Sequence, residues 1–395
     1  MKVVLLNNDL RVYWKGRLVY LRNFLGSKKI NLYAIELFGK GSPYSFDDYD
    51  NEEKWWTCMF PQNSAGELSK EDIRKGVFST LDKINPDVVI ASSIVFFAGA
   101  LGIRWAKKNK KKFIMFDDAK PSQFKRNFLV QGVKNIITKQ SDFLWLPSNE
   151  YDNEYTELLN GKVPFFYGYD CVNNDLFKVS SKRVFNNNRI ICVGRLVPIK
   201  NIDKLLRAWQ QIELKGIDWK LSIIGKGPDY ETLINLSAFL KLQNVEFLGT
   251  VNNNDIPAHF YNSDVFILPS LSETWGLVVN EAMAAGLPVL LSNKVNAAHT
   301  LLHNGVNGFS FDPCDEDSMA ETILKYISLD FVHKKNMSAK SLSIISEMSY
   351  EKMGIQLKEA LTQVMLSTFK SPGLIANVIL NLWGGRYNTS AWDKL

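Results

Sequence analysis

Residues 264–293, DVFILPSLSETWGLVVNEAMAAGLPVLLSN, decide the fold of this chain. The segment begins with an apolar run, passes through a polar turn into a helical pattern near Gly276, and ends in a second apolar run, PVLLSN (288–293). A buried strand, a short loop and a helix in this order form one unit of a parallel α/β sheet. Ligands bind such sheets outside the carboxyl ends of the strands, where a helix start offers amides and a positive dipole end to phosphate.

The alternation of strand and helix patterns continues on both sides of this segment. In the first half, candidate strands lie at 3–8, 30–37, 54–60, 86–92, 112–116 and 142–148. Residues 168–188 are rich in Asn, Ser and charge and indicate a linker. After it, candidate strands lie at 189–195, 219–225, 245–251, 264–270 and 288–293. We predict two α/β domains, over 1–175 and 176–370, and an apolar helix within 371–387 that packs far from its sequence neighbours.

Composition narrows the classes of function. The chain has 395 residues, 46% of them hydrophobic, and a net charge of +6, too small an excess to indicate nucleic-acid binding. Its four cysteines are far apart and form no CxxC pair, which argues against a disulfide framework or a zinc site and fits a reducing cytoplasm. The N-terminus lacks the pattern of a signal peptide. Residues 88–103 are uncharged but fall short of the roughly 20 residues that span a bilayer, so we interpret them as core.

Two glutamates flank the helix start in the deciding segment. Glu273 precedes the helix, and Glu281 lies inside it with seven residues between them. A carboxylate beside a phosphate site is unfavourable unless it accepts hydrogen bonds from neutral hydroxyls, such as those of a sugar or a ribose. The alternative is one exposed cap glutamate and one ordinary helix glutamate.

A second strand-to-helix junction carries two cations. In VGRLVPIKNIDKLLRAW (193–209), Arg195 and Lys200 follow a strand that ends in glycine, and neither has an adjacent acid to pair with. Two such cations at the carboxyl edge of a sheet suit a diphosphate. The alternative is that both are ordinary surface charges.

Taken together, these segments resemble the large retaining glycosyltransferase family 4, also described as glycosyl transferases group 1, of the GT-B fold. The matching elements run in order along the chain: GYDCVNNDLF (168–177), VGRL with its following lysine, IIGKGP (223–228), VEFLGTV (245–251), the E-x7-E segment, and NGVNGFSFDP (304–313). The resemblance covers about residues 164–330.

The resemblance implies two Rossmann-like domains that face each other across a cleft, with a C-terminal helix in 371–395 crossing back to the first. It implies retaining, metal-independent sugar transfer from a UDP- or GDP-sugar to a saccharide or lipid-linked acceptor, in envelope or exopolysaccharide assembly, without a cofactor. By matched position the donor residues are Arg195 and Lys200 for the diphosphate, Glu273 for the sugar, the amides of Gly276 and Leu277 for a phosphate, and Glu281 for the ribose.

The sequence departs from the family pattern at four places. The glycine pair after the first strand is reduced to Gly16, and Asp117 stands on the acceptor side where the family has a histidine. The glycine pair of the donor loop becomes Asn296-Ala297, and its glutamate becomes Thr300. These changes leave open a second hypothesis, a non-catalytic nucleotide-sugar binder that scaffolds a partner transferase. A GT-B epimerase or phosphorylase is a third.

Three other motifs have a structural and a functional interpretation. FDDYD (46–50) is interpreted as an acidic loop in preference to a metal site, and His299 and His303 as structural or substrate-proximal residues in preference to metal ligands. KKNKKK (107–112) is either a solvated helix end or a basic patch for lipid headgroups. The second interpretation predicts a cytoplasmic protein in peripheral contact with the anionic inner face of the membrane.

Overall fold

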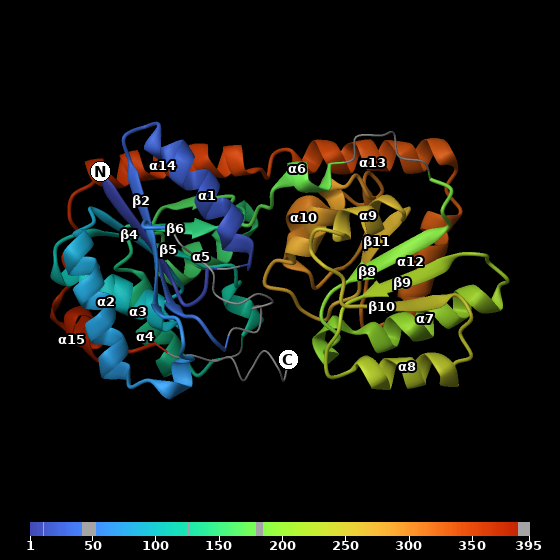
Figure 1. The fold of residues 1–395 in the computed structure, drawn as a ribbon, viewed down its shortest axis with the longest axis horizontal. Helices are drawn as coiled ribbons and strands as arrows, with labels where there is room; N and C mark the ends of the chain where they lie inside the picture. Colours follow the sequence, from blue (N-terminus) through green and yellow to red (C-terminus); the bar gives the residue numbers. More distant parts are fainter. Residues whose placement is uncertain (11, 42–52, 125, 179–184, 386–395) are drawn as a thin grey trace. The chain divides into compact units, whose positions relative to one another are not determined.

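Two parallel β-sheets organise the chain, each inside its own folding unit, as the computed structural model in Figure 1 shows. The structure describes residues 1–10, 12–41, 53–124, 126–178 and 185–385. The first unit is built from Met1–Tyr169 and Tyr350–Asp393, and the second from Asp170–Ser349. The chain thus returns to the first unit at Tyr350, where helix α14 begins and packs on α1, ahead of the Pro-Gly break at Pro372.

Within the described residues, the first sheet has seven parallel strands in the order β3-β2-β1-β4-β5-β6-β7. Their bounds are Lys2–Asn7 (β1), Asn31–Phe38 (β2), Trp56–Phe60 (β3), Val88–Ser92 (β4), Lys112–Phe116 (β5), Phe143–Leu146 (β6) and Phe165–Tyr167 (β7). The six predicted strands are confirmed; the pattern does not indicate β7, whose three residues form too short a run. All five residues of β4 are buried, which confirms that this uncharged stretch is core, and no helix of the described residues is long and apolar enough to span a membrane.

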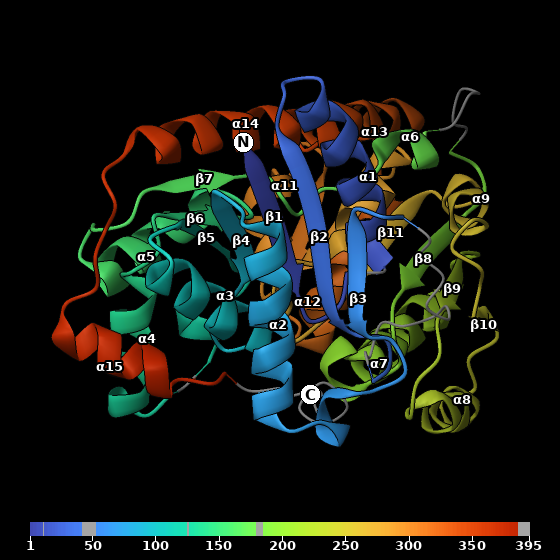
Figure 2. The same cartoon turned by 60° about the vertical axis from the view of Figure 1, so that its left-hand side comes forward.

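Helices cover this sheet. They are α1 (Val12–Gly26), α2 (Lys70–Ile84), α3 (Phe97–Lys108), α4 (Phe128–Thr138), α5 (Asp152–Leu159), α14 (Tyr350–Leu366) and α15 (Leu374–Leu382). Local chemistry fixes their ends: the Ser69 hydroxyl accepts the Asp72 N–H at the start of α2, and Asn85 ends it in the left-handed conformation. In Figures 1 and 2, α15 lies beside α4, and the two helices are in contact. The Trp383 indole then donates to the Ile94 carbonyl at 2.7 Å, which ties the end of α15 to the start of the α3 region.

The lysine-rich run 107–112 is not a uniformly solvated helix end, and that interpretation is wrong for its two outer lysines. The Lys107 ammonium pairs with Asp142 at 3.0 Å, and its side chain is 2% exposed. The Lys112 ammonium donates to the carbonyls of Ser367 and Thr368 at 2.7 and 2.9 Å. Only the middle of the run, with Lys108 and Lys110, is exposed. Buried ammonium groups need such partners because an unpaired buried charge is very costly.

The second sheet has six parallel strands among the described residues, in the order β10-β9-β8-β11-β12-β13. Their bounds are Arg189–Val193 (β8), Lys220–Ile224 (β9), Val245–Gly249 (β10), Val265–Leu268 (β11), Val289–Ser292 (β12) and Gly308–Phe311 (β13). Five were predicted and are confirmed, whereas β13 is a four-residue run inside a glycine-rich motif. The strand order reverses between β8 and β11, the kind of position where open α/β sheets bind ligands.

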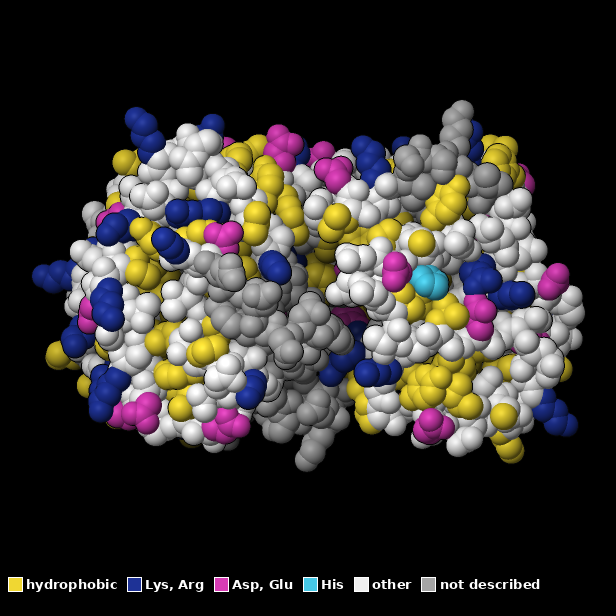
Figure 3. All heavy atoms as spheres, viewed as in Figure 1, with side chains coloured by type: hydrophobic (Ala, Val, Ile, Leu, Met, Phe, Trp, Pro, Cys, Tyr) yellow, Lys and Arg dark blue, Asp and Glu magenta, His cyan; other side chains and the backbone are white. Residues whose placement is uncertain are grey.

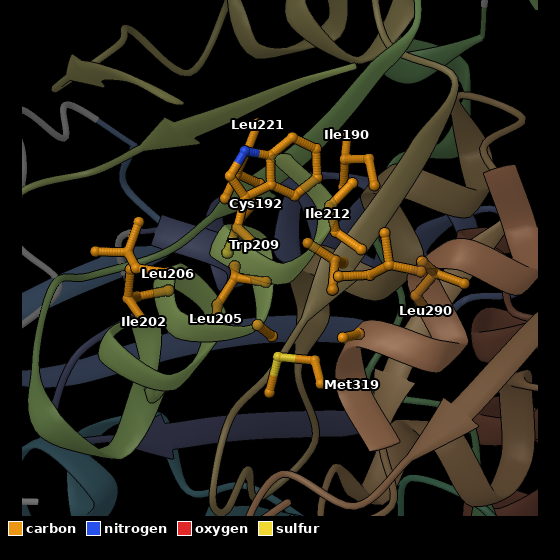
Figure 4. Packing of buried hydrophobic residues seen from close by; sticks show 14 of the residues in the cluster. Ile190, Cys192, Ile202, Leu205, Leu206, Trp209, Ile212, Leu221, Leu290 and Met319 are labelled. Carbon is orange, nitrogen blue, oxygen red and sulfur yellow. The ribbon is translucent and has the colours of Figure 1, made fainter. Parts of the chain in front are cut away.

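The helices of the second unit enclose a continuous apolar core. They are α6 (Asn174–Phe177), α7 (Ile202–Leu214), α8 (Tyr230–Phe239), α9 (Ile256–Tyr261), α10 (Leu277–Ala284), α11 (Asn296–Leu301), α12 (Glu316–Ile327) and α13 (Phe331–Ile345). Figure 4 shows Trp209 of α7 packed with Cys192 of β8, Leu221 of β9 and the aliphatic side chains around them. Trp209 is fully buried, so this core holds α7 and the loop before it against the sheet.

Candidate functional site

The loop after β8 is shaped by close backbone packing. Gly225, with φ +141°, lies so near this loop that a Cβ atom there would be 1.8 Å from the Gly194 carbonyl oxygen. A Cβ on Gly227 would lie 2.1 Å from the carbonyl oxygen of Leu196. The glycines of the IIGKGP motif therefore let the loop after β9 pack directly on the loop that carries Arg195. Arg195 is half-buried there.

Lys200 lies at the end of a short 3-10 turn, Pro198–Lys200, just before α7. A Cβ atom on Gly194 would meet the aliphatic stem of Lys200 at ordinary contact distance. Asn201 follows in the left-handed conformation, and its buried side chain donates to the carbonyls of Pro269 and Pro313 at 3.1 and 2.8 Å. These two hydrogen bonds tie the start of α7 to the segments that follow β11 and β13.

The loop after β11 carries the predicted glutamate. The Ser270 hydroxyl donates to Glu273 Oε1 at 2.6 Å. Gly276 follows at the N-cap of α10 with φ +106°, a conformation that favours glycine, and α10 begins at Leu277 as predicted. A first turn of helix leaves its amide N–H groups without intrahelical partners, and Gly276 has no side chain to satisfy them.

The structure brings the two loops together. Lys200 Nζ forms an ion pair with Glu273 Oε1, and the two side chains are 17% and 14% exposed. The Leu271 N–H also donates to the Ile199 carbonyl at 2.8 Å. The expectation that Lys200 has no acid to pair with is therefore wrong, because its partner is 73 residues away in the sequence and adjacent in space. A cation, a carboxylate and a helix start thus share one edge of the sheet.

The interior beside this pair is apolar. Burial raises the pKa of the Cys192 thiol to about 12, the positive charge of Lys200 lowers it, and the carboxylate of Glu273 raises it. The thiol at the end of β8 therefore stays protonated at neutral pH and serves as packing beneath the charged groups.

Glu281 lies on α10, one turn beyond its start, and is half-buried. The neighbouring Asn280 is fully buried, accepts from the Trp275 indole at 2.9 Å and donates to the Asp170 carbonyl at 2.9 Å. Trp275 is itself 1% exposed. These positioning residues orient α10 and the loop before it. The prediction did not include them, because an asparagine and a tryptophan inside an apolar pattern carry no ligand signal of their own.

The segment at Asn296-Ala297, where the sequence departs from the family pattern, stabilises a neighbouring loop. The Asn296 side chain donates to the Thr274 carbonyl at 2.9 Å, and the Ala297 N–H donates to the Trp275 carbonyl at 3.0 Å. Both residues begin α11 and hold the loop that contains Glu273. Thr300 is half-buried on the same helix.

A cavity of about 590 Å³ lies at the carboxyl ends of β9 and β10 and is lined by the segments that follow these two strands. Its lining includes Gly227, Tyr230 and Thr250. Its volume is in the range of small-molecule sites.

The two predicted residues of the first unit lie in different settings. Gly16 is inside α1, where a Cβ atom would lie 2.5 Å from the Tyr350 hydroxyl, so helix packing accounts for a glycine there. Asp117 follows β5 at the carboxyl edge, and its carboxylate accepts the Ala119 N–H at 3.2 Å. Burial lowers the pKa of Lys134 to about 8 although nearby Asp117 raises it. Burial and the same carboxylate raise the pKa of Tyr155.

Of the two candidate metal motifs, the structure describes only the histidine pair. FDDYD (46–50) lies outside the described residues. Both His299 and His303 are exposed, and α11 ends at Leu301, so the pair does not share a helix. Among the described parts of the chain, no group of three His, Cys, Asp or Glu side chains is placed to hold a metal ion.

Comparison with known proteins shows what the second unit is similar to. Residues 174–342 match the family described as glycosyl transferases group 1. The chain is 34% identical over 151 residues to an uncharacterized glycosyltransferase of Haemophilus influenzae, which covers 38% of this chain and 41% of that protein. It is 32% identical over 142 residues to a GDP-mannose-dependent alpha-(1-6)-phosphatidylinositol monomannoside mannosyltransferase of Mycolicibacterium smegmatis, covering 34% and 37%. The chain thus spans about two fifths of the length of these curated relatives.

The fold is also found among solved structures. A sucrose-phosphate synthase from Thermosynechococcus elongatus superposes with a TM-score of 0.75 at 15% identity, over 93% of this chain and all of that one. At this identity the likeness concerns the fold alone, and it confirms the GT-B class with two Rossmann-like sheets. The domain limits and the cleft expected from the resemblance stay predictions.

Proposed function

We propose that this protein is a retaining glycosyltransferase, starting from the match of residues 174–342 to the family described as glycosyl transferases group 1. The observation that carries the proposal is the junction of two loops at the reversal point of the second sheet. There Lys200 pairs with Glu273 next to the start of α10. Cations and helix amides at one edge match a diphosphate, and carboxylates match sugar hydroxyls.

The donor is a UDP- or GDP-sugar. Arg195, Lys200 and the amides of Gly276 and Leu277 hold its diphosphate. Glu281 accepts hydrogen bonds from the ribose, and the adjacent 590 Å³ cavity receives the base. Glu273 accepts from hydroxyls of the transferred sugar. Lys200 then lies between two anions, a carboxylate and a phosphate, so donor binding redistributes its contacts without leaving it unpaired.

The transfer step places new negative charge on the departing diphosphate. The bond between the anomeric carbon and the diphosphate oxygen breaks, and a bond from the acceptor oxygen to the same face of that carbon forms. The departing phosphate takes the acceptor proton, so no protein nucleophile is required. Negative charge grows on the diphosphate during this step, and Lys200 and Arg195 therefore bind the transition state more tightly than the bound donor.

The acceptor is a saccharide or a lipid-linked saccharide of the cell envelope or an exopolysaccharide. The relative from Mycolicibacterium smegmatis is a GDP-mannose-dependent phosphatidylinositol monomannoside mannosyltransferase by name, which supports a nucleotide-sugar donor and a lipid-linked acceptor. Asp117, with Lys134 beside it, is the candidate contact on the acceptor side. We place the reaction in the cytoplasm, where nucleotide sugars are made.

The test is a thermal-shift screen of UDP- and GDP-sugars followed by product analysis. A true donor raises the unfolding midpoint, because binding to the native state adds stability by mass action. With that donor, an acceptor extract must increase nucleoside-diphosphate release and yield a glycosylated product of retained configuration. Binding without turnover would favour a non-catalytic scaffold. Conversion of the donor alone to an epimeric sugar, or release of sugar phosphate, would favour an epimerase or a phosphorylase.

We also propose that transfer requires no divalent metal, since Arg195, Lys200 and the helix amides supply the positive field at the diphosphate. Activity is expected to survive dialysis against a chelator. Loss of activity that only manganese or magnesium restores would overturn this part of the proposal.

A further inference from the structure

The cavity of the second unit has its walls in the segments that follow β9 and β10. The Gly225 N–H donates to the Gly249 carbonyl at 2.8 Å, which holds these two segments together. The Lys226 carbonyl accepts the Leu196 N–H at 3.0 Å. Because Leu196 directly follows Arg195, one wall of the cavity is bonded to the loop that carries Arg195.

Three polar side chains line this cavity, those of Lys226, Glu231 and Thr250. Beside them lies the half-buried ring of Tyr230, which packs edge-on against Phe247 of β10 with 6.1 Å between the ring centroids. In the described part of the chain, the exposed side chains of Lys226 and Glu231 have no hydrogen-bond or ion-pair partner. One ammonium and one carboxylate on the same cavity are therefore both open to a ligand.

The overall charge of the second unit does not distinguish one nucleoside diphosphate from another. GDP and UDP carry the same diphosphate, so a field that acts on charge attracts both alike. On the face that Figure 3 displays, acidic and basic side chains of the second unit are scattered and do not gather into a patch of one sign. Selection between bases therefore depends on the groups that line the cavity.

The two bases offer different edges to a carboxylate. Guanine has two neighbouring donors, N1–H and the N2 amino group, with the acceptor O6 next to them. Uracil has a single donor, N3–H, with an acceptor oxygen on each side. A carboxylate has only acceptors, so it takes both guanine donors at once but faces an acceptor oxygen of uracil. An ammonium has only donors and complements guanine O6.

We propose that this cavity selects guanine, and hence that the donor is a GDP-sugar. Glu231 accepts from N1–H and the N2 amino group, Lys226 donates to O6, and the Tyr230 ring packs on the base. The inference rests on the proposed function, which leaves the nucleotide open. Glu231 also disfavours uracil, because a carboxylate and an acceptor oxygen that face each other repel.

Glu231 has a structural interpretation as well. It lies in the first turn of α8, where the positive end of the helix dipole favours a negative charge. If that were its whole role, replacing it would lower the stability of the fold and would change the binding of all nucleotides equally. The preference between bases is the property that only the ligand role alters.

The experiment is titration calorimetry of the full chain with GDP, UDP and inosine diphosphate, which keeps N1–H and O6 of guanine but lacks the N2 amino group. The variants are Glu231→Gln and Lys226→Met, and the charge-matched control is Glu321→Gln on α12. All three positions are exposed, so folding should survive, and an unchanged unfolding midpoint verifies this.

We expect the wild type to bind GDP at least about tenfold more tightly than UDP, with inosine diphosphate between them. Glu231→Gln should weaken GDP binding about tenfold without weakening UDP binding. Lys226→Met should weaken GDP and inosine diphosphate alike, because both carry O6, and the control should change none of the three.

Two outcomes would overturn guanine selection and leave the transferase proposal standing. One is UDP binding as tight as GDP binding, and the other is a GDP preference that Glu231→Gln leaves unchanged. If the wild type bound none of the nucleoside diphosphates, the donor site itself would be wrong, and the selection of guanine with it.

Discussion

The two sheets have the same strand order around their point of reversal, but the loops at that point carry different side chains. In the first unit the reversal lies between β1 and β4, and Asn8 follows β1. The Asn8 side-chain oxygen accepts the Ala98 N–H in the first turn of α3 at 3.1 Å. In the second unit the reversal lies between β8 and β11. There Gly276 begins α10 with no side chain at all, and Lys200 and Glu273 stand beside it.

The difference shows how one topology serves two purposes. A helix start at the carboxyl edge has amide groups that need acceptors, and an internal asparagine can supply one. Where the chain places a glycine instead, the N-cap side chain supplies no acceptor, and the position is open to water or to an anionic ligand. Strand order therefore locates a candidate site, and only the residues in the loops decide whether it is used.

The largest expected effect is on turnover, when either cation of the proposed diphosphate site in the second unit is removed. Lys200→Ala and Arg195→Ala should each lower turnover by roughly 100-fold or more, because these cations act on charge that develops as the diphosphate leaves. The measurement is single-turnover transfer with saturating donor. The matched control is Lys204→Ala on α7, whose ammonium donates to the Cys314 carbonyl and lies outside the junction.

If turnover did not require Lys200 and Arg195, the contrast between the reversal points of the two sheets would be wrong. The predicted result also requires that each variant keep its unfolding midpoint, since Lys200 is largely buried in its pair with Glu273. Asp47→Ala changes the FDDYD motif (46–50), which lies outside the described residues, and is predicted to leave turnover near the wild-type value.

A strand can be predicted from the sequence when its apolar run is long enough to show a pattern. Continuous apolar runs such as 88–92 and 265–268 predict strands, and the strand-to-helix junctions then predict which loops share an edge. The short strands β7 and β13 carry too little pattern to be found.

Pairings across long separations are the part that sequence patterns do not reveal. The buried amide of Asn201 reaches Pro269 and Pro313, and Gly16 packs against Tyr350, because the tertiary fold brings distant segments together. A lone asparagine or glycine carries no signal for a partner more than 60 residues away. For the same reason, the ion pair of Lys200 with Glu273 could not be predicted from either loop alone.

A smaller effect is expected from the ribose contact. Glu281→Ala should weaken donor binding by about 1.5–3 kcal/mol, or about 10- to 150-fold in Kd, with little change in turnover at saturation, because ribose hydroxyls change little during the reaction. Titration calorimetry with the donor, beside the exposed control Glu321→Ala on α12, measures it. A variant that lost turnover and kept donor affinity would place Glu281 at the reacting sugar instead.

A substitution at the reversal point of the first sheet should lower the stability of the fold. Asn8→Ala removes the acceptor of the Ala98 N–H, and we expect a loss of about 1 kcal/mol in unfolding free energy, as for a helix cap. Denaturant unfolding measures this loss, with the exposed Asn31→Ala at the start of β2 as the control. Donor affinity should not change. If Asn8→Ala weakened donor binding at unchanged stability, the first reversal point would also be a ligand site, and the contrast between the two units would disappear.

The smallest effect is expected in the pH dependence of stability, and it comes from Lys134 beside Asp117 in the first unit. Burial lowers the pKa of Lys134 to about 8 in the folded chain, near Asp117, from its usual value of 10.5. Between these two values the unfolded chain binds more protons than the folded one, so this lysine makes stability rise with pH; below the folded pKa it contributes no slope. Thermal unfolding between these pH limits should rise less steeply in Lys134→Met than in the wild type. The exposed control Lys108→Met should leave the slope unchanged. Because burial also lowers the pKa of Lys107, Lys334 and Lys370, only the difference between variant and wild type reports on Lys134. An identical slope in both would mean that Lys134 reaches solvent, and Asp117, the proposed acceptor contact, would then have no buried cation beside it.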